Sequence, residues 1–299
     1  MTIVKQFKMK IILTSCLITL AVLFCNGQNQ KRTLKTGTME YCTGTDFCGK
    51  ATYQFYIDPS TSSEIKHGTF KASGISKSDY GFSSFSISGQ FIDGYRNGLW
   101  IFIQQRKDMP IQGGSFSTGK LKSTQSFKNG LPDGKWRLHE IWKTRDLFEI
   151  NGKSVWGHFS DNIIDTAFTT FKDGIAVGIT YCKRYGDESR ATLNNNGFVT
   201  GNYIDPSSKS TFNSYGVMTK YEGQQIDTAV IRKVNMYLEG KISKSKLDEL
   251  SIRVETTTDL LEFISGMFEQ DFFKGAGGDK TMESQGQKRI YGRRIKVTW

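Results

Sequence analysis

One turn signature recurs along the chain and constrains its fold more than any other feature. It reads as an aromatic or apolar residue, a polar residue, Asn or Asp, Gly, three further residues and a second Gly, often followed by an aromatic residue. It occurs at residues 91–100, 127–136 and 171–180 and, in a weaker form, at 193–203. Glycines also recur at Gly130, Gly152, Gly174 and Gly197, with spacings of 22, 22 and 23 residues. Since periods of this length are typical of stacked repeats, we predict a repeat protein.

The residue types explain the structure that the signature predicts. Asn-Gly and Asp-Gly supply the positive φ angles of a tight hairpin turn, and the second glycine permits a bulge where neighbouring hairpins meet. A single hairpin buries too little apolar surface to be stable, so successive hairpins are expected to stack. The predicted fold is mainly β: an elongated antiparallel β-hairpin array that forms a single-layer sheet, with a C-terminal helical segment. The predicted repeat turns are Gly94, Gly98, Gly130, Gly134, Gly152, Gly174, Gly178, Gly197 and Gly201, and the predicted repeat-packing aromatic residues are Phe91, Trp100, Phe127, Trp136 and Phe171.

The segment 116–122 (FSTGKLK), which leads into 127–136 (FKNGLPDGKW), resembles the MORN-repeat-variant family, whose members are often labelled YwqK-like antitoxins. The upstream stretches 51–56 and 67–70 resemble the opening of exported relatives. The resemblance covers roughly residues 50–223. It implies a one-layer sheet of consecutive hairpins that contacts proteins or lipid surfaces. The spacing from Gly94 to Gly130 is 36 residues, so we expect insertions or irregular pairing in the early repeats.

Five regions are predicted along the chain: a signal peptide at 1–27, an N-terminal β segment at 28–90, hairpin repeats at 91–223, a helical cap at 224–273, and a basic tail with a terminal strand at 274–299. The leader begins with Lys5, Lys8 and Lys10, and an apolar stretch of 14 residues follows at 11–24. This layout is typical of a secretory signal, with cleavage after Gly27 or Gln28.

Two alternatives to simple secretion follow from the same leader. A membrane anchor would need about 20 apolar residues, and 14 are too few. Lipidation could use Cys16 or Cys25, but Cys16 lies at the start of the apolar stretch and Cys25 follows the bulky Phe24. We therefore expect an exported bacterial protein of the periplasm or cell surface, and not an integral membrane protein.

The charge of the chain narrows the classes of partner. The formal net charge is +11, and the chain beyond residue 27 remains strongly basic. A basic exported protein favours anionic lipid headgroups or acidic glycans, whereas nucleic acid is not expected outside the cytoplasm. The alternative is that the charge serves solubility alone.

Three cysteines follow the leader, and in an oxidising compartment Cys42 and Cys48 could close a small disulfide loop. Cys182 would then remain as a buried thiol. We expect the three to be structural, with no metal and no cofactor.

The composition changes after Gly223. Asp227 is expected to cap a helix that carries Val230, Val234 and Leu238 at helical spacing and ends at Gly240. A second helix is expected after Thr257 or Thr258, with an apolar face of Leu260, Leu261, Ile264, Met267 and Phe268. The pair could cap the last sheet edge or bind a partner; capping is preferred because an open edge invites aggregation.

Motifs for catalysis are missing from the sequence. His67, His139 and His158 have no metal-ligand spacing, and we find no nucleophile elbow, phosphate loop or zinc-protease helix. A carboxylate pair distant in sequence could still form a hydrolase, with Asp46, Asp133, Asp165 and Glu149 as free candidates. Trp142 and Trp156 lie off the turn signature and are the candidates for exposed, sugar-binding aromatic residues.

The leading hypothesis is an exported, non-enzymatic repeat protein that mediates protein–protein contacts with an unidentified envelope protein. The alternatives are a module that binds anionic lipid or glycan, and a hydrolase that uses an unrecognised carboxylate pair.

Overall fold

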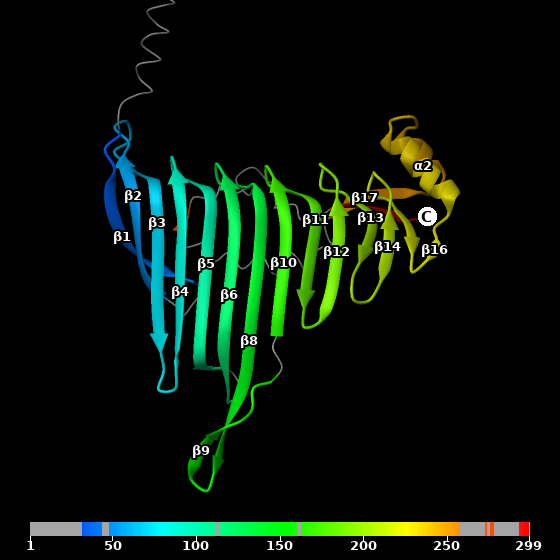
Figure 1. Cartoon of the computed structure of the whole chain (residues 1–299). Coiled ribbons are helices and arrows are strands. Elements are labelled where there is room, and N and C mark those ends of the chain that lie inside the picture. The colour runs from blue at the N-terminus through cyan, green and yellow to red at the C-terminus, as the bar shows by residue number, and fades with distance from the viewer. Residues whose placement is uncertain are drawn as a thin grey trace, which may run out of the picture. The chain divides into compact units, whose positions relative to one another are not determined.

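The computed structural model describes residues 32–43, 48–111, 114–160, 163–257, 273, 276–277 and 293–298. In this part of the chain, sixteen strands form one antiparallel sheet and two more form a separate ribbon (Figure 1). The prediction of a mainly β, hairpin-built antiparallel sheet with a small C-terminal helical part is confirmed. The second helix expected after Thr257 or Thr258 lies outside the described residues.

The strands follow one another across the sheet almost in chain order, as expected for consecutive hairpins: β1-β2-β3-β4-β5-β6-β8-β10-β11-β12-β13-β14-β15-β16, with β7 paired to β6 and β9 paired to β8. Their bounds are β1 Lys35–Cys42, β2 Cys48–Ile57, β3 Glu64–Lys77, β4 Phe82–Ile92, β5 Tyr95–Pro110, β6 Ser115–Lys128, β7 Leu131–Pro132, β8 Gly134–Ile150, β9 Lys153–Trp156, β10 Ile163–Lys172, β11 Ile175–Arg184, β12 Asp187–Leu193, β13 Val199–Ile204, β14 Lys209–Phe212, β15 Met218–Tyr221 and β16 Gln224–Gln225. The remaining elements are α2 Thr228–Leu238, α3 Lys244–Glu249, β17 Arg253–Thr257 and β18 Arg294–Thr298.

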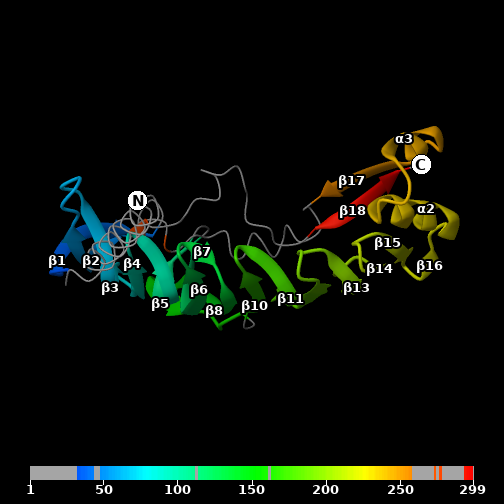
Figure 2. The same ribbon diagram turned by 90° about the horizontal axis from the view of Figure 1, so that it is seen from above.

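The two faces of the sheet differ in burial because side chains alternate along each strand. On one face, a registered row crosses eight strands: Ala72, Ile87, Phe102, Ser123, Leu138, Ala167, Cys182 and Ser189. Every member of that row is buried. We call this the covered face. Seen from above in Figure 2, the strands of the sheet succeed one another along a curve.

At one end of the strands, equivalent turns join neighbouring hairpins through backbone hydrogen bonds. The amide of Gly94 donates to the carbonyl of Lys66 at 2.8 Å, Gly130 to Arg96 at 2.9 Å, and Gly174 to Pro132 at 2.8 Å. In the last two cases, the acceptor lies two residues after the turn glycine of the preceding hairpin. Asp93, Asn129 and Asp173, just before these glycines, also have positive φ, which is the conformation of a tight hairpin turn.

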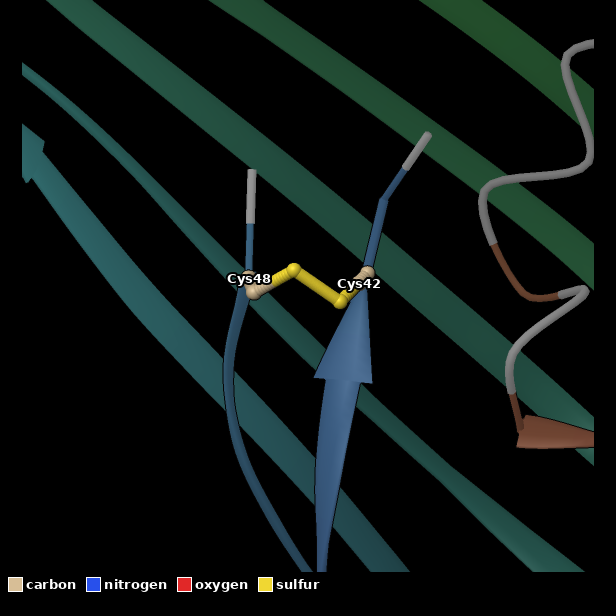
Figure 3. The surroundings of a disulfide bond; sticks show 2 residues. All are labelled: Cys42 and Cys48. Carbon is tan, nitrogen blue, oxygen red and sulfur yellow. A yellow bond between two sulfur atoms is a disulfide. The ribbon is translucent and has the colours of Figure 1, made fainter. Parts of the chain in front are cut away.

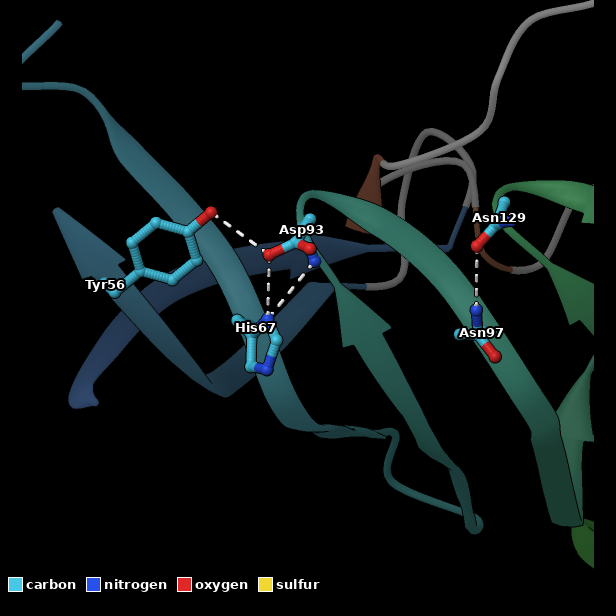
Figure 4. A network of polar contacts seen from close by, with 5 residues as sticks. All are labelled: Tyr56, His67, Asp93, Asn97 and Asn129. Atoms are coloured by element: carbon cyan, nitrogen blue, oxygen red, sulfur yellow. Dashed lines mark hydrogen bonds and ion pairs between the residues drawn. The ribbon is translucent and has the colours of Figure 1, made fainter. Parts of the chain in front are cut away.

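The residue that follows each of these carbonyl acceptors makes a second contact with the same turn through its side chain. His67 Nδ1 lies 3.2 Å from Asp93 Oδ1, and Asn97 Nδ2 donates to Asn129 Oδ1 at 3.4 Å (Figure 4). Asp133 Oδ1 accepts from the amide of Asp173 at 3.3 Å. His67, Asn97 and Asp133 thus hold the turn of the next hairpin, and His67 has this structural role in the array.

The aromatic residues of the signature pack between hairpins on the covered face. Trp100 Nε1 donates to the carbonyl of Gln90 at 3.2 Å, and Trp136 Nε1 donates to that of Ser126 at 2.9 Å, across the same spacing of ten residues. A Cβ at Gly89 would lie 2.2 Å from the Trp100 ring, so only glycine lets this ring lie flat on β4. Phe91, Phe127 and Phe171 pack against these tryptophan rings. The ring centroids of Trp136 and Phe171 lie 4.7 Å apart.

The even glycine spacing seen in the sequence does not mark one row of equivalent turns. Gly130 and Gly174 are buried at the end of the strands just described, whereas Gly152 is exposed in the turn of the β8–β9 hairpin. Figure 1 shows this hairpin projecting from the opposite end of the sheet. Equivalent turns are therefore 44 residues apart, from Gly130 to Gly174, because the antiparallel strands β8 and β10 both lie between them.

A second apolar cluster forms where the chain ends. Val217, Val234, Leu247, Ile252 and Ile295 bury one another, and they join β15, α2, α3 and β18. Asp227 caps α2 by accepting from the amide of Ala229 at 2.8 Å, as the sequence predicts. The amide of Ile295 donates to the carbonyl of Gly216 at 2.8 Å, which ties β18 to the sheet. The strand β17, which pairs with β18, was not anticipated.

Candidate functional site

The face opposite the covered face presents registered rows of exposed and half-buried side chains, and we call it the open face. Its first row crosses from β2 to β14 and has the members Thr52, Lys71, Ser88, Ile101, Thr124, Arg137, Phe168, Tyr181, Arg190, Ile204 and Lys209. The second row, two residues away along the strands, has the members Lys50, Ser73, Ser86, Ile103, Lys122, His139, Thr166, Lys183 and Glu188.

Shorter rows extend the open face toward the far end of the strands. One continues through Ile75, Ser84, Gln105, Lys120 and Ile141, and another through Lys77, Phe82 and Lys107. Partners directly opposite in an antiparallel pair share a face, so these rows form one continuous surface.

The charge on this surface is nearly all of one sign. Its basic residues are Lys50, Lys71, Lys77, Lys107, Lys120, Lys122, Arg137, Lys183, Arg190 and Lys209, and all ten are exposed. Glu188 is the only acidic residue among the described members of the rows. None of the ten forms an ion pair within the part of the chain that the structure describes. Glu188 lies directly opposite Lys183 in the strand register.

The uncharged members of the rows are mainly short hydroxyl side chains and, in equal number, isoleucine and phenylalanine side chains. Ser73, Ser84, Ser86 and Ser88 cover the β3–β4 part of the face. The aromatic pair Phe168 and Tyr181 stacks on itself, with ring centroids 5.3 Å apart and planes at 21°. The open face thus combines cations with hydroxyl and apolar side chains, and the rings of its central aromatic pair contact each other.

Neither tryptophan that the sequence marked for exposure forms a free aromatic stripe. Trp142 is half-buried and packs against the covered-face core, with the Arg106 guanidinium 5.0 Å from its ring centroid. Its ring lies over Gly119, where a Cβ would meet it at 2.3 Å. Trp156 is also half-buried, because Arg145 lies 3.8 Å from its ring centroid and Phe116 packs edge-on at 4.9 Å.

The Arg145 side chain anchors the projecting β8–β9 hairpin. Its guanidinium donates to Asp108 Oδ1 at 2.7 Å and lies between the rings of Trp156 and Phe159. This cluster explains why Trp156 is half-buried, because it packs the base of the hairpin against β5 and β6. We assign it a structural role.

One pair of carboxylates faces each other on the covered side. Glu140 of β8 is the cross-strand partner of Asp165 of β10. Burial, and then the charge of Asp165, raises the pKa of Glu140 to about 7, although Arg106 and Arg184 offset part of the effect. Asp165 is itself buried and accepts from the amide of Tyr185 at 3.1 Å, with Arg184 Nε 3.6 Å away.

The other carboxylates considered for hydrolysis do not join this pair. Asp133 binds a turn amide at the opposite edge, Glu149 lies on the projecting hairpin, and Asp46 lies outside the described residues. Burial, followed by Asp165, also raises the pKa of the neighbouring Cys182 thiol to about 11, so this thiol stays protonated.

Two of the three cysteines that follow the leader are joined. Cys42 and Cys48 form a disulfide between the end of β1 and the start of β2 (Figure 3). Together with Glu40 they place three potential ligand atoms within 4.8 Å of one another, but a disulfide supplies no thiolate. The observed bond therefore serves as a staple for the first hairpin.

Sequence reasoning missed the open face because its cations are far apart in the chain. Lys71, Arg137, Arg190 and Lys209 come to lie in one row only through strand register. The usable signal was the alternation of lysine with a buried apolar residue in single strands, such as Lys120-Leu121-Lys122. In the described residues, no helix has the length and apolarity to cross a bilayer. Comparison with protein-family models, curated proteins and solved structures finds no match.

Proposed function

We propose that this chain is a non-enzymatic binding protein of the bacterial cell envelope, and that its open face holds an anionic partner. The proposal includes export, as the leader at 1–27 suggests, and a hairpin array of the MORN-variant kind. The partner is an acidic component of the envelope, and the array acts as a scaffold that displays the contact surface.

The supporting observation is the ten unpaired cations of the open face against the single Glu188. Exposed like charges repel one another and add nothing to folding, so their concentration on one face needs an explanation outside stability. A face that served solubility alone would mix both signs. Complementary charge instead brings an anionic partner to the face quickly and fixes its position.

Binding to an anionic ligand tests the proposal. We would measure association of the mature chain with vesicles that contain phosphatidylglycerol and with alginate, a linear acidic polysaccharide, at low and high salt. Binding to at least one of them should occur at low salt and weaken strongly at high salt, since exposed charges are screened within about 8–10 Å at physiological ionic strength.

Matched variants connect binding to the face. The open-face variant carries Lys122→Gln, Arg137→Gln, Lys183→Gln and Arg190→Gln. The control variant carries Lys153→Gln, Arg232→Gln, Lys233→Gln and Lys244→Gln, which removes the same charge from exposed positions elsewhere. We expect the open-face variant to lose binding and the control to keep most of it. Equal losses in both variants, or binding that salt does not change, would disprove the proposal.

A further inference from the structure

We infer that the open face binds a linear acidic polysaccharide laid across the strands, an inference that rests on the function proposed above. The alternatives for an anionic partner are a lipid headgroup surface and a nucleic acid. Three features distinguish between polysaccharide, lipid and nucleic acid. They are the shape of the cationic area, the side chains between the cations and the contacts of the aromatic residues.

The cationic area is longer across the strands than along them. From Lys71 on β3 to Lys209 on β14 there are nine strand-to-strand steps, and steps of about 4.8 Å give a length of about 43 Å. Along the strands, the four rows between Lys71 and Lys77 span about 20 Å at about 3.4 Å per residue, and the exposed Lys135, two residues before Arg137 on β8, extends the area beyond the first row. A flexible polymer can lie along such a strip and meet a cation at every few strands.

The cations within the strip are spread and do not converge on one point. In the first row, Lys71, Arg137, Arg190 and Lys209 are separated by four, three and two strands. At about 4.8 Å per strand these separations are about 19, 14 and 10 Å, which are too large for one small anion to bridge. The arrangement suits a ligand with many charges along one chain, since each added contact is then intramolecular and raises the affinity.

The groups between the cations favour a sugar polymer. Between Lys71 and Arg137, the first row has Ser88, Ile101 and Thr124. Between Lys50 and Lys122, the second row has Ser73, Ser86 and Ile103, so two of the three side chains in each stretch carry a hydroxyl group. Hydroxyl groups both donate and accept, so they match the hydroxyl groups of a polysaccharide between its acidic groups.

The aromatic residues of the rows argue against single-stranded nucleic acid. Proteins that bind single strands stack bases on free aromatic rings. On the open face, the rings of Phe168 and Tyr181 stack on each other. This contact uses one face of each ring, so fewer ring faces remain for bases to stack on.

Ligand length provides the test. Affinity would be measured by titration calorimetry for alginate fractions with extended lengths of about 15 Å and about 45 Å, compared per acidic group. The long fraction should bind at least about tenfold more tightly, because only it reaches both ends of the strip. Two end variants probe the reach: Lys50→Gln with Lys71→Gln, and Arg190→Gln with Lys209→Gln. Each end variant should lower the affinity for the long fraction severalfold, whereas the control variant Lys233→Gln with Lys244→Gln should leave this affinity unchanged.

Each outcome decides between the classes. If both fractions bind equally per acidic group, or if only one end variant matters, the inference is wrong while the proposed function stands. The same holds if phosphatidylglycerol vesicles bind and the long alginate does not displace them, or if a single-stranded DNA of equal length and charge binds about tenfold more tightly than alginate. If neither alginate, vesicles nor DNA binds with salt sensitivity, the proposed function itself fails.

Discussion

The guanidinium of Arg96 donates a hydrogen bond to the main-chain carbonyl of Phe273, a residue 177 positions later in the chain. The same side chain donates through Nε to the carbonyl of Gly277 at 3.1 Å, and its charge lies 5.3–5.6 Å from the rings of Trp100, Phe127 and Phe273. Arg96 is fully buried, so this charge depends on those carbonyls and rings for its solvation. One side chain thereby fixes a C-terminal residue onto the covered face.

Replacing Arg96 should loosen this contact. Arg96→Met keeps the apolar stem but leaves two carbonyls without their donor, so we expect a loss of about 2–4 kcal/mol in the free energy of unfolding. Urea denaturation measures the loss, and limited proteolysis should show faster cleavage near Phe273. Arg137→Met, at an exposed site, is the control and should change stability little. A stable Arg96→Met variant with unchanged proteolysis would show that the contact is unimportant.

The two repeat tryptophans offer a test of structural equivalence. Trp100→Phe and Trp136→Phe each remove an indole that is fully buried and whose N–H bonds a carbonyl ten residues earlier. Each should lower the free energy of unfolding by about 2–3 kcal/mol, from the lost hydrogen bond and the void. Trp156→Phe, at a half-buried ring, should cost less. Chemical denaturation of the three variants would expose a difference if Trp100 and Trp136 are not equivalent.

The Glu140 and Asp165 pair should make stability depend on pH. The pKa of Glu140 is about 7 in the folded chain against an ordinary value of 4.5, so the folded state holds a proton that the unfolded state releases between these values. Stability therefore falls as pH rises from about 4.5 to 7, by an amount on the order of 2 kcal/mol.

Glu140→Gln removes this titration. The variant should match the wild type near pH 4.5 and be more stable at pH 8, where the wild type carries two charged carboxylates side by side. Thermal unfolding across this pH range provides the measurement, and Glu149→Gln on the exposed hairpin is the control. Parallel pH profiles for the wild type and Glu140→Gln would contradict the assignment.

Reducing the Cys42–Cys48 disulfide should have a modest effect. The bond closes a loop with a sequence separation of six, for which loop entropy gives a contribution of about 2 kcal/mol. A reductant should therefore lower the unfolding midpoint, and the Cys42→Ser, Cys48→Ser double variant should be insensitive to it. If the reductant shifts both proteins equally, it acts elsewhere.

The fold was predictable from local chemistry where that chemistry is strong. Asp93-Gly94, Asn129-Gly130 and Asp173-Gly174 adopt positive φ because few other pairs tolerate it, and this fixed the hairpin architecture. Phe127 and Trp136 pack together as the signature required. The helix capped by Asp227 was also readable, because capping is a local interaction.

The remaining features depend on contacts that spacing cannot reveal. The equal glycine spacings on either side of Gly152 reflect the lengths of the strands. Gly152 lies in the turn of the projecting β8–β9 hairpin, at the end of the strands opposite to Gly130 and Gly174. The sequence predicts exposed rings for Trp142 and Trp156 because the turn signature does not include the arginines that cover them. Arg106 lies over Trp142, and Arg145 lies over Trp156. The open face arises from register across strands, and register follows from turn lengths and bulges that single segments do not determine.

Lysine footprinting tests the binding role of the open face most directly. The mature chain would be acetylated with and without long alginate, and the rate at each lysine read by mass spectrometry. We expect Lys71, Lys122, Lys183 and Lys209 to be modified severalfold more slowly in the complex, whereas Lys153, Lys233 and Lys244 keep their rates. Protection of the second group, or of neither group under conditions in which alginate is bound, would contradict the account.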